Sequence, residues 1–293
     1  MRAGLLLVAA VTLATGGIVG QSGVRPASSS SGGVLVGVTA RRDNDQTTPI
    51  NSKEVSVYDN GIEQAIRNFT PDPSPAKIAL LVDNSLTIRA DVDKLEQAAR
   101  EFAYEIYKGD KLLIVGYDEQ AEIVTDWTDD ANAIEKSLKL FRKKGQPYLF
   151  DAIRAVLAEA LRPIPSQKKV IVVISDGLDR GSKATFENTL AELQTDNITV
   201  YAIQAVDRTR GAIRRDVPKP RVVIDKLVEG TGGQIFSIEK PQEAAKAICD
   251  ELRKDRYVLS YIPSSAPFGQ ARSFLVLANQ GITVRAKSMQ QPH

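Results

Sequence analysis

Cysteine and histidine are almost absent from this chain of 293 residues. Cys249 is the only cysteine, so no disulfide can form within the chain. In "EAAKAICDELRK" it shares a helical face with Ala245, Ile248 and Leu252, which predicts a buried and inert thiol. The only histidine, His293, is the last residue of the sequence, so we expect neither a histidine-based catalytic triad nor a histidine-rich zinc site. We therefore expect a fold that is stabilised by its apolar core, which a chain of this length can build.

A strong charge imbalance and the usual nucleotide-binding motifs are also lacking. The net charge is +2, so no global field favours nucleic acid or an anionic membrane surface. The segment "GLDRGSKAT" (177–185) does not have the spacing of a phosphate loop, and no GxGxxG stands between a predicted strand and helix. Hydrophobic residues make up 43% of the chain and charged residues 25%, which is typical of a globular protein with a real core.

The N-terminal segment differs from the rest. Arg2, a short apolar run over 5–14 and the small residues of "TGGIVGQ" predict a secretory signal peptide over 1–20, cleaved after Gly20. The run is too short to span a bilayer, so we expect an exported protein, periplasmic or secreted, with no transmembrane segment after cleavage. An uncleaved anchor is the alternative. Residues 21–33, "QSGVRPASSSSGG", have the composition of a flexible linker.

Two kinds of pattern divide the remainder. Residues 77–254 alternate apolar strands with amphipathic helices, which predicts an α/β fold with a doubly wound, mainly parallel, Rossmann-like sheet. Residues 34–72 and 256–288 have β patterns, and Asn60-Gly61 predicts a hairpin with a type I′ turn. We expect these two segments to pair into one small β module. The predicted helices cover residues 90–107, 129–142, 149–163, 183–197, 221–233 and 241–254.

Two of the most apolar predicted strands end in acidic segments, "VDNSLT" and "ISDGLD". Parallel strands end at the same edge of a sheet, where ligands bind, so Asp83 and Asp176 would meet there if the strands are neighbours. Their repulsion would be relieved by Mg²⁺ or Mn²⁺, which accept carboxylate, hydroxyl and water ligands, and Ser85 and Thr87 would supply the hydroxyls. The alternative is capping, with Ser85 or Thr87 starting the next helix and Asp176 closing the turn after its strand.

The pattern Asp83-x-Ser85-x-Thr87 with Ser175-Asp176-Gly177 resembles the metal-ion-dependent adhesion site of von Willebrand factor type A (VWA) domains, over residues 77–254. The whole chain also resembles bacterial exported VWFA-related proteins in four segments, "VYDNG", "YDEQAEIVTDWT", "GQPYLFDAI" and "YVLSYIP". The resemblance implies a protein-binding module of VWA fold. In that module a partner carboxylate would complete the coordination of a bound Mg²⁺ or Mn²⁺.

The sequence departs from the family pattern at two positions. Thr87 stands where the family usually has serine, which keeps the hydroxyl. Pro147 stands where the family has a threonine, and proline has no side-chain oxygen, so one expected ligand is missing. Asp151, four residues further on, is an acid in the first turn of a helix, for which we expect a structural role.

A basic segment is expected at the same edge of the sheet. Residues 207–221, "DRTRGAIRRDVPKPR", follow a predicted strand and carry Arg208, Arg210, Arg214 and Arg215. These arginines could favour an acidic partner by charge steering, or they could belong to an ordinary solvated loop.

Three functions remain open on these residues. We expect a binding protein and not an enzyme, with a protein partner and no nucleic acid, because no recognisable pattern places a nucleophile beside Asp83 or Asp176. The alternatives are a metal-independent structural or interaction domain of an envelope assembly and, on chemistry alone, a metal-dependent hydrolase.

Overall fold

The computed structural model describes residues 33–44, 48–88, 90–139, 141–165, 168–205, 219–264 and 270–292. The predicted signal peptide and all but the last residue of the predicted linker lie outside these ranges. The same is true of Arg208, Arg210, Arg214 and Arg215.

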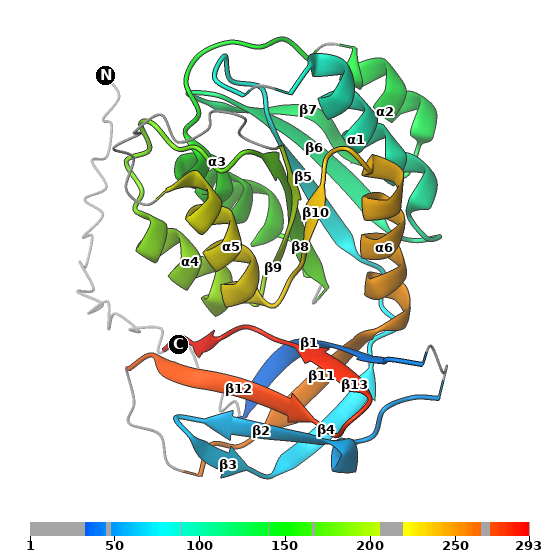
Figure 1. The fold of residues 1–293 in the computed structure, drawn as a ribbon, viewed down its shortest axis with the longest axis vertical. Coiled ribbons are helices and arrows are strands. Elements are labelled where there is room, and N and C mark those ends of the chain that lie inside the picture. The colour runs from blue at the N-terminus through cyan, green and yellow to red at the C-terminus, as the bar shows by residue number, and fades with distance from the viewer. Residues whose placement is uncertain are drawn as a thin grey trace, which may run out of the picture. The chain divides into compact units, whose positions relative to one another are not determined.

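A six-stranded sheet forms the centre of the α/β part, in the order β10-β9-β8-β5-β6-β7 (Figure 1). Its strands are β5 (Lys77–Asp83), β6 (Lys111–Tyr117), β7 (Ala121–Thr128), β8 (Lys169–Ser175), β9 (Thr199–Gln204) and β10 (Ile235–Ser237). All neighbouring pairs are parallel except β6 with β7. The inner strands are almost continuously buried because helices cover both faces, whereas in the edge strand β7 only Thr125 is buried.

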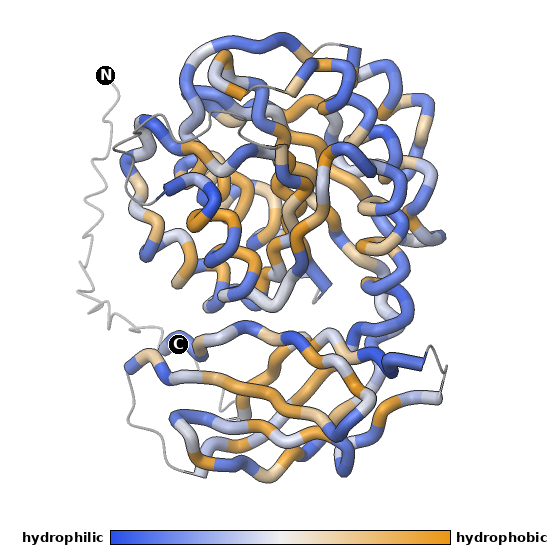
Figure 2. Tube along the Cα trace, viewed as in Figure 1, coloured by the Kyte–Doolittle hydropathy of each residue, from blue (hydrophilic) through white to orange (hydrophobic). Residues whose placement is uncertain are grey.

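Helices lie on both faces of this sheet (Figure 1). One face is covered by α1 (Val92–Glu105), α2 (Ala131–Leu138) and α6 (Pro241–Lys254). The other is covered by α3 (Leu149–Ala155), which continues as the π-helical turn η2 (Val156–Leu161), and by α4 (Phe186–Thr195) and α5 (Pro220–Thr231). The apolar residues concentrate along the strands and the helix sides that face them, as Figure 2 shows. The predicted doubly wound, mainly parallel α/β fold is confirmed.

Residues Gly33–His293 form one compact unit. Within it, both ends of the described chain build a β module. Its two sheets have the orders β13-β1-β11-β4 and β14-β12-β2-β3, and their inner faces share one apolar core. Its elements are β1 (Val34–Arg42), η1 (Ser52–Glu54), β2 (Val55–Asp59), β3 (Ile62–Gln64), β4 (Ile66–Pro71), β11 (Arg256–Tyr261), β12 (Arg272–Ala278), β13 (Ile282–Arg285) and β14 (Met289–Gln290). The expected pairing of the two segments is therefore confirmed.

The predicted hairpin joins β2 to β3 in this module. Asn60 and Gly61 have φ values of 50° and 76°, as a type I′ turn requires. Asp59, just before the turn, is buried and forms an ion pair with Arg272 at 2.8 Å. The same carboxylate accepts a hydrogen bond of 2.8 Å from the hydroxyl of Tyr261. Asp59 of the segment "VYDNG" and Tyr261 of the segment "YVLSYIP" therefore meet in one buried polar cluster.

A second buried polar cluster joins the β module to the α/β part. The carboxylate of Glu251 in α6 accepts hydrogen bonds from Thr39 of β1 at 3.1 Å and from Tyr201 of β9 at 2.5 Å. It also pairs with the guanidinium of Arg285 in β13. The cluster ties four elements from distant parts of the sequence together.

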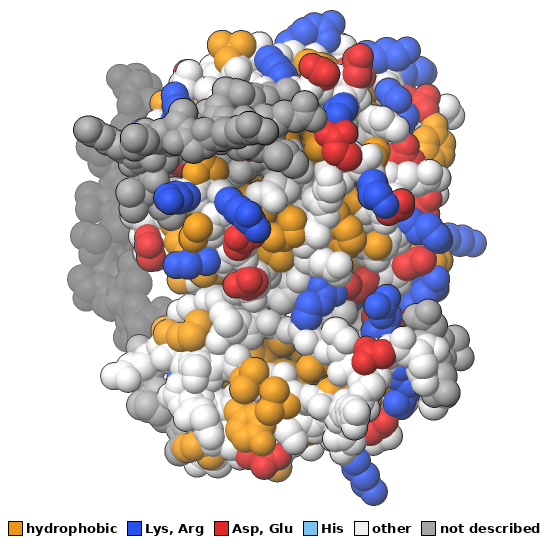
Figure 3. Space-filling model, in the orientation of Figure 1, with side chains coloured by type: hydrophobic (Ala, Val, Ile, Leu, Met, Phe, Trp, Pro, Cys, Tyr) orange, Lys and Arg blue, Asp and Glu red, His pale blue; other side chains and the backbone are white. Residues whose placement is uncertain are grey.

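Charges of both signs are interspersed over the face of the molecule seen in Figure 3, in keeping with the small net charge. Within the described ranges, no helix is both long and apolar enough to cross a membrane.

Candidate metal site

Three neighbouring strands bring polar residues to one level at the carboxyl edge of the sheet. Asp83 ends β5 and lies opposite Tyr117, the last residue of β6, in the strand register. On the other side, β5 pairs with β8 up to Val82 and Ile174, so Asp83 stands beside Ser175. The two strands with acidic ends are neighbours, which is the condition for Asp83 and Asp176 to meet at this edge.

Asp83 is a buried carboxylate, and its side chain is held by neutral donors. It is 0% exposed, and its Oδ1 accepts a hydrogen bond of 3.0 Å from the backbone N–H of Ser85. Its Oδ2 accepts from the hydroxyls of Ser175 at 2.9 Å and Tyr117 at 3.2 Å. Burial raises the pKa of Asp83, and hydrogen bonds from Ser85, Ser175 and Tyr117 oppose that rise. Among the described residues, no cationic side chain bonds to this carboxylate.

The two predicted hydroxyl ligands lie side by side. Ser85 Oγ and Thr87 Oγ1 form a hydrogen bond of 3.0 Å with each other, and Ser85 is fully buried whereas Thr87 is half-buried. Two adjacent oxygen ligands of an octahedral Mg²⁺, each about 2.1 Å from the ion, are themselves about 3.0 Å apart. The spacing of the two hydroxyls therefore fits such an ion.

Capping does not explain the two hydroxyls. Helix α1 begins at Val92 with Asp91 as its N-cap residue, and Ser85 and Thr87 lie too far upstream to cap it. The capping alternative is therefore wrong for these two residues.

Asp176, in contrast, takes part in the turn after its strand. It is 5% exposed, and its Oδ1 accepts a hydrogen bond of 2.9 Å from the backbone N–H of Leu178. Gly177 has a φ of 84°, and a Cβ there would lie 2.4 Å from the carbonyl oxygen of Pro220. Only glycine can lead the chain through this close approach to α5.

A site made only of carboxylates is not present in the described part of the chain. No group of three or more His, Cys, Asp or Glu side chains that could hold a metal lies within the described ranges. The other oxygen-bearing side chains predicted for this edge are the hydroxyls of Ser85 and Thr87, a ligand type that Mg²⁺ accepts together with water.

Pro147 is buried in the loop next to the Ser85–Thr87 segment. The two loops are linked by a hydrogen bond of 3.1 Å from Leu86 N–H to the carbonyl of Gly145. The carbonyl oxygen of Pro147 accepts a hydrogen bond of 2.8 Å from Arg180 N–H. Its loop is thus close to the metal candidates, but Pro147 itself provides no side-chain oxygen.

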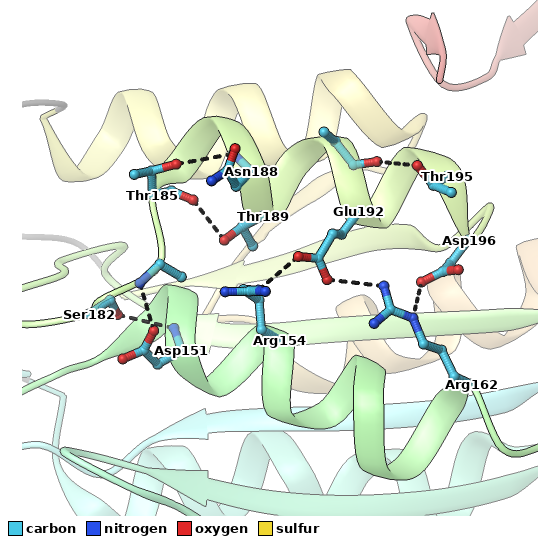
Figure 4. Close-up of polar contacts among 12 residues, drawn as sticks. Asp151, Arg154, Arg162, Ser182, Thr185, Asn188, Thr189, Glu192, Thr195 and Asp196 are labelled. Atoms are coloured by element: carbon cyan, nitrogen blue, oxygen red, sulfur yellow. Dashed lines mark hydrogen bonds and ion pairs between the residues drawn. The ribbon is translucent and has the colours of Figure 1, made fainter. Parts of the chain in front are cut away.

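Asp151 fastens the loop that follows Asp176 (Figure 4). Its two carboxylate oxygens accept hydrogen bonds from the backbone N–H groups of Lys183 at 2.9 Å and Ala184 at 2.8 Å. Its own N–H donates to the hydroxyl of Ser182 at 3.1 Å. These contacts agree with the structural role expected for this residue.

Tyr117 was not predicted as part of this edge. Its hydroxyl bonds to Ser175 at 2.9 Å, and its side chain is 0% exposed. The available signal was a tyrosine at the end of the apolar strand "KLLIVGY", where an aliphatic residue would fit a buried position equally well.

Part of the chain, including this edge of the sheet, is similar in sequence to a known protein family. Residues 78–178, which include both strand ends, match the sequence profile of the von Willebrand factor type A domain. The chain contains a VWA domain. Such domains mediate protein interactions and often bind a divalent metal. No curated protein sequence matches the chain.

Solved structures share the fold at low sequence identity. A von Willebrand factor type A protein from Catenulispora acidiphila is 9% identical with a TM-score of 0.50, covering 88% of this chain and 73% of that one. Proximal thread matrix protein 1 from the mussel byssus is 15% identical with a TM-score of 0.50, over 61% of this chain and 48% of that one. The present chain therefore spans about half of the mussel protein. Another structure of the mussel protein has zinc in its metal-ion-dependent adhesion site (MIDAS) motif. That structure is 13% identical with a TM-score of 0.48, over 64% of this chain and 47% of that one.

Proposed function

We propose that this VWA domain is a protein-binding module that holds Mg²⁺ or Mn²⁺ through the hydroxyls of Ser85 and Thr87. The carboxylates of Asp83 and Asp176 would act mainly through bound water, and a carboxylate of the partner would complete the coordination. One observation carries the proposal. Two hydroxyl oxygens lie 3.0 Å apart, directly after a buried carboxylate that has no cationic partner among the described residues.

The buried carboxylate gives a physical reason for a cation at this place. An ionised carboxylate out of water is unfavourable unless hydrogen bonds and an opposite charge compensate it. Asp83 has the hydrogen bonds but, among its described neighbours, no opposite charge. A divalent ion next to Ser85 and Thr87 would supply that charge and would favour the ionised form of the carboxyl group.

Pro147 makes the proposed site weaker than a full set of ligands would be. With no oxygen at that position, an additional water or a partner oxygen would take the vacant position, and Mg²⁺ readily keeps several waters. We therefore propose that useful affinity depends on the partner carboxylate. The proposed role is binding and not catalysis, at a place outside the cytoplasm if the predicted signal peptide over 1–20 directs export.

A metal titration tests the proposal. Mn²⁺ and Mg²⁺ are titrated into the purified protein, and into the variants Asp83→Ala and Thr87→Val, with calorimetric heat and thermal stability as readouts. We expect saturable, metal-dependent stabilisation of the wild type, abolished in Asp83→Ala and weakened in the nearly isosteric Thr87→Val. Asp126→Ala, which removes an exposed acid of the edge strand β7, is the control and should respond as the wild type does. A wild type without metal-dependent heat or stabilisation would favour the metal-independent interaction domain.

A second variant tests the missing ligand directly. Pro147→Thr returns a hydroxyl to the position where the family has one. We expect tighter Mn²⁺ binding by about tenfold, the lower end of the range in which single contacts tune metal sites. Unchanged affinity in a folded Pro147→Thr protein would show that this position does not face the ion.

We also propose that Arg208, Arg210, Arg214 and Arg215 steer an acidic partner toward the edge. The support is their position in the sequence, directly after a strand that ends at this edge. A partner captured from an envelope fraction, with and without chelator, gives the binding assay. Reversing Arg214 and Arg215 to glutamate should slow association at low salt, and equal association rates would contradict the steering role.

A further inference from the structure

We infer that Tyr117 is a positioning residue of the candidate metal site. Acting through Ser175, its hydroxyl holds the Asp83 carboxylate in the orientation that leaves Oδ1 toward the Ser85–Thr87 loop. This inference rests on the proposed function, because it concerns how the protein prepares the same site. Tyr117 comes from a third strand, β6, whereas the candidate ligands follow β5 and β8.

Tyr117 is placed by the sheet and fixed by the core. It ends β6, in register with Asp83 at the end of β5, and it is 0% exposed. Its ring belongs to the apolar cluster on the α3–α5 face, together with Leu81, Leu149 and Ile153. A buried ring has few alternative orientations, so the hydroxyl is held at one place beside Asp83 and Ser175.

The hydrogen-bond directions at Ser175 follow from counting its donors and acceptors. A serine hydroxyl has one proton to donate and two lone pairs that can accept. The backbone N–H of Gly177 donates to Ser175 Oγ at 3.0 Å, and Tyr117 lies 2.9 Å from the same oxygen. With both lone pairs used, the proton of Ser175 is directed to Asp83 Oδ2 at 2.9 Å.

This relay makes the two oxygens of Asp83 different. Oδ2 faces inward and has two hydroxyl neighbours, Ser175 at 2.9 Å and Tyr117 at 3.2 Å. Oδ1 accepts from the backbone N–H of Ser85, the first residue of the hydroxyl pair, and the side chain of Ser85 also bonds to this carboxylate. Oδ2 is therefore enclosed by two buried hydroxyls, whereas Oδ1 lies beside the hydroxyl pair that would hold a cation or its bound water.

Removing the Tyr117 hydroxyl would release this arrangement. The Ser175 hydroxyl would regain a free lone pair and could rotate, so the Asp83 carboxylate would no longer be held in one orientation. Partners that orient a metal-binding carboxylate typically change metal affinity by 10- to 100-fold when they are removed. A purely structural tyrosine would affect stability but not metal affinity.

The chain contains a matched control for this argument. Tyr201 is also 0% exposed, and its hydroxyl also donates to a buried carboxylate, that of Glu251. Its cluster joins α6 to the β module and includes none of the candidate metal ligands. Tyr201→Phe therefore removes the same chemical group from an equally buried ring without touching the site.

The experiment measures the dissociation constant for Mn²⁺ by calorimetry in the wild type, Tyr117→Phe, Ser175→Ala, the double variant and Tyr201→Phe. We expect Tyr117→Phe to weaken binding about tenfold and Tyr201→Phe to leave it within twofold. If Tyr117 acts through Ser175, the double variant should bind no more weakly than Ser175→Ala alone.

The results distinguish a failure of the inference on Tyr117 from a failure of the proposed metal site. Equal affinity of the wild type and Tyr117→Phe would overturn the inference and leave the metal site standing. Additive losses in the double variant, or an equal loss in Tyr201→Phe, would also overturn it. A wild type that does not bind Mn²⁺ removes both. Should Tyr117→Phe fail to fold, Ser175→Ala against Tyr201→Phe tests the same relay, and equal affinity there would overturn it.

Discussion

Asp83 and Glu251 are both buried carboxylates, and each lies within hydrogen-bond distance of the hydroxyl of a fully buried tyrosine. They differ in the charge beside them. Glu251, at the junction with the β module, pairs with the guanidinium of Arg285. Asp83, at the carboxyl edge of the sheet, has only neutral donors among the described residues.

The difference separates a structural carboxylate from a candidate functional one. A buried ion pair is complete within the protein, and breaking it leaves an uncompensated charge. A buried carboxyl group with hydrogen bonds but no cation is either protonated or open to an opposite charge that comes from elsewhere. The contrast can be tested by neutralising each carboxylate in turn.

The largest effect should come from Glu251→Gln. This change leaves Arg285 without its anion in a mostly buried cluster, so we expect the free energy of unfolding to fall by about 3 kcal/mol, the range for breaking a buried pair. Urea unfolding measures it. Glu243→Gln on the same helix, where the side chain is 70% exposed, is the control and should change stability by less than about 1 kcal/mol. A similar small loss in Glu251→Gln would show that the junction does not depend on this charge.

Asp83→Asn should have a smaller effect on the metal-free protein. It removes an unpaired charge from a buried position while keeping the size of the side chain, so the gain from desolvation offsets part of the lost hydrogen bonding. We expect a change in unfolding free energy below about 1 kcal/mol, together with loss of the response to Mn²⁺. A loss as large as that of Glu251→Gln would abolish the proposed distinction between the two carboxylates.

Asp255, the C-cap residue of α6, is a third carboxylate, less buried than Asp83 and Glu251. Burial and the nearby charge of Glu251 raise the pKa of Asp255 to about 6, against partial compensation by Arg41. The folded state then binds this proton more tightly than the unfolded state does. The contribution of Asp255 to stability is complete below about pH 4 and is lost as the pH rises through about 6.

Replacing Asp255 by asparagine should therefore stabilise the protein at neutral pH only. Because the side chain is half-buried and partly screened by solvent, we expect a gain of about 1 kcal/mol at pH 7 and no gain at pH 4. Urea unfolding of both proteins at the two pH values measures the difference. The same gain at both pH values would show that the effect is not due to ionisation.

Glu192 in α4 is a partly exposed counterpart at the surface, and its replacement should have the smallest effect. It forms ion pairs with Arg154 at 2.8 Å and Arg162 at 3.0 Å (Figure 4). We expect Glu192→Gln to lower stability by at most about 1 kcal/mol in low salt and by less in 1 M salt. A salt-independent loss would contradict a surface electrostatic origin.

The two arginines reach Glu192 together because of the π-helical turn η2. They are eight residues apart, a spacing that turns the two side chains about 80° from each other around a regular α-helix. The N–H of Arg162 bonds to the carbonyl of Leu157, five residues earlier, at 2.9 Å. One extra residue in this turn brings Arg154 and Arg162 to the same face. The sequence predicted one regular helix over 149–163, and a local periodicity argument could not locate this turn.

Much of the fold and part of the candidate site could be predicted from local sequence. The positions of the helices, the apolar strands and the Asn60-Gly61 turn follow from periodicity and turn chemistry, because these signals act over a few residues. Asp83, Ser85, Thr87 and Asp176 were identified as candidates from their place after apolar strands, and the structure shows that the two strands are neighbours. The contribution of Tyr117 could not be predicted, since it depends on the register between β5 and β6.

The sequence by itself determined the alternation of strands and helices, the oxygen-bearing residues after β5 and β8, and the absence of a side-chain oxygen at Pro147. These are properties of single segments, fixed by side-chain chemistry and local periodicity. Only the tertiary structure decided which buried carboxylate has a cation beside it. Arg285 and Glu251 are 34 residues apart and meet through the pairing of the chain ends, whereas no such pairing brings a described cationic side chain to Asp83. Charge compensation in a core depends on which distant segments pack together, and local sequence does not contain that information.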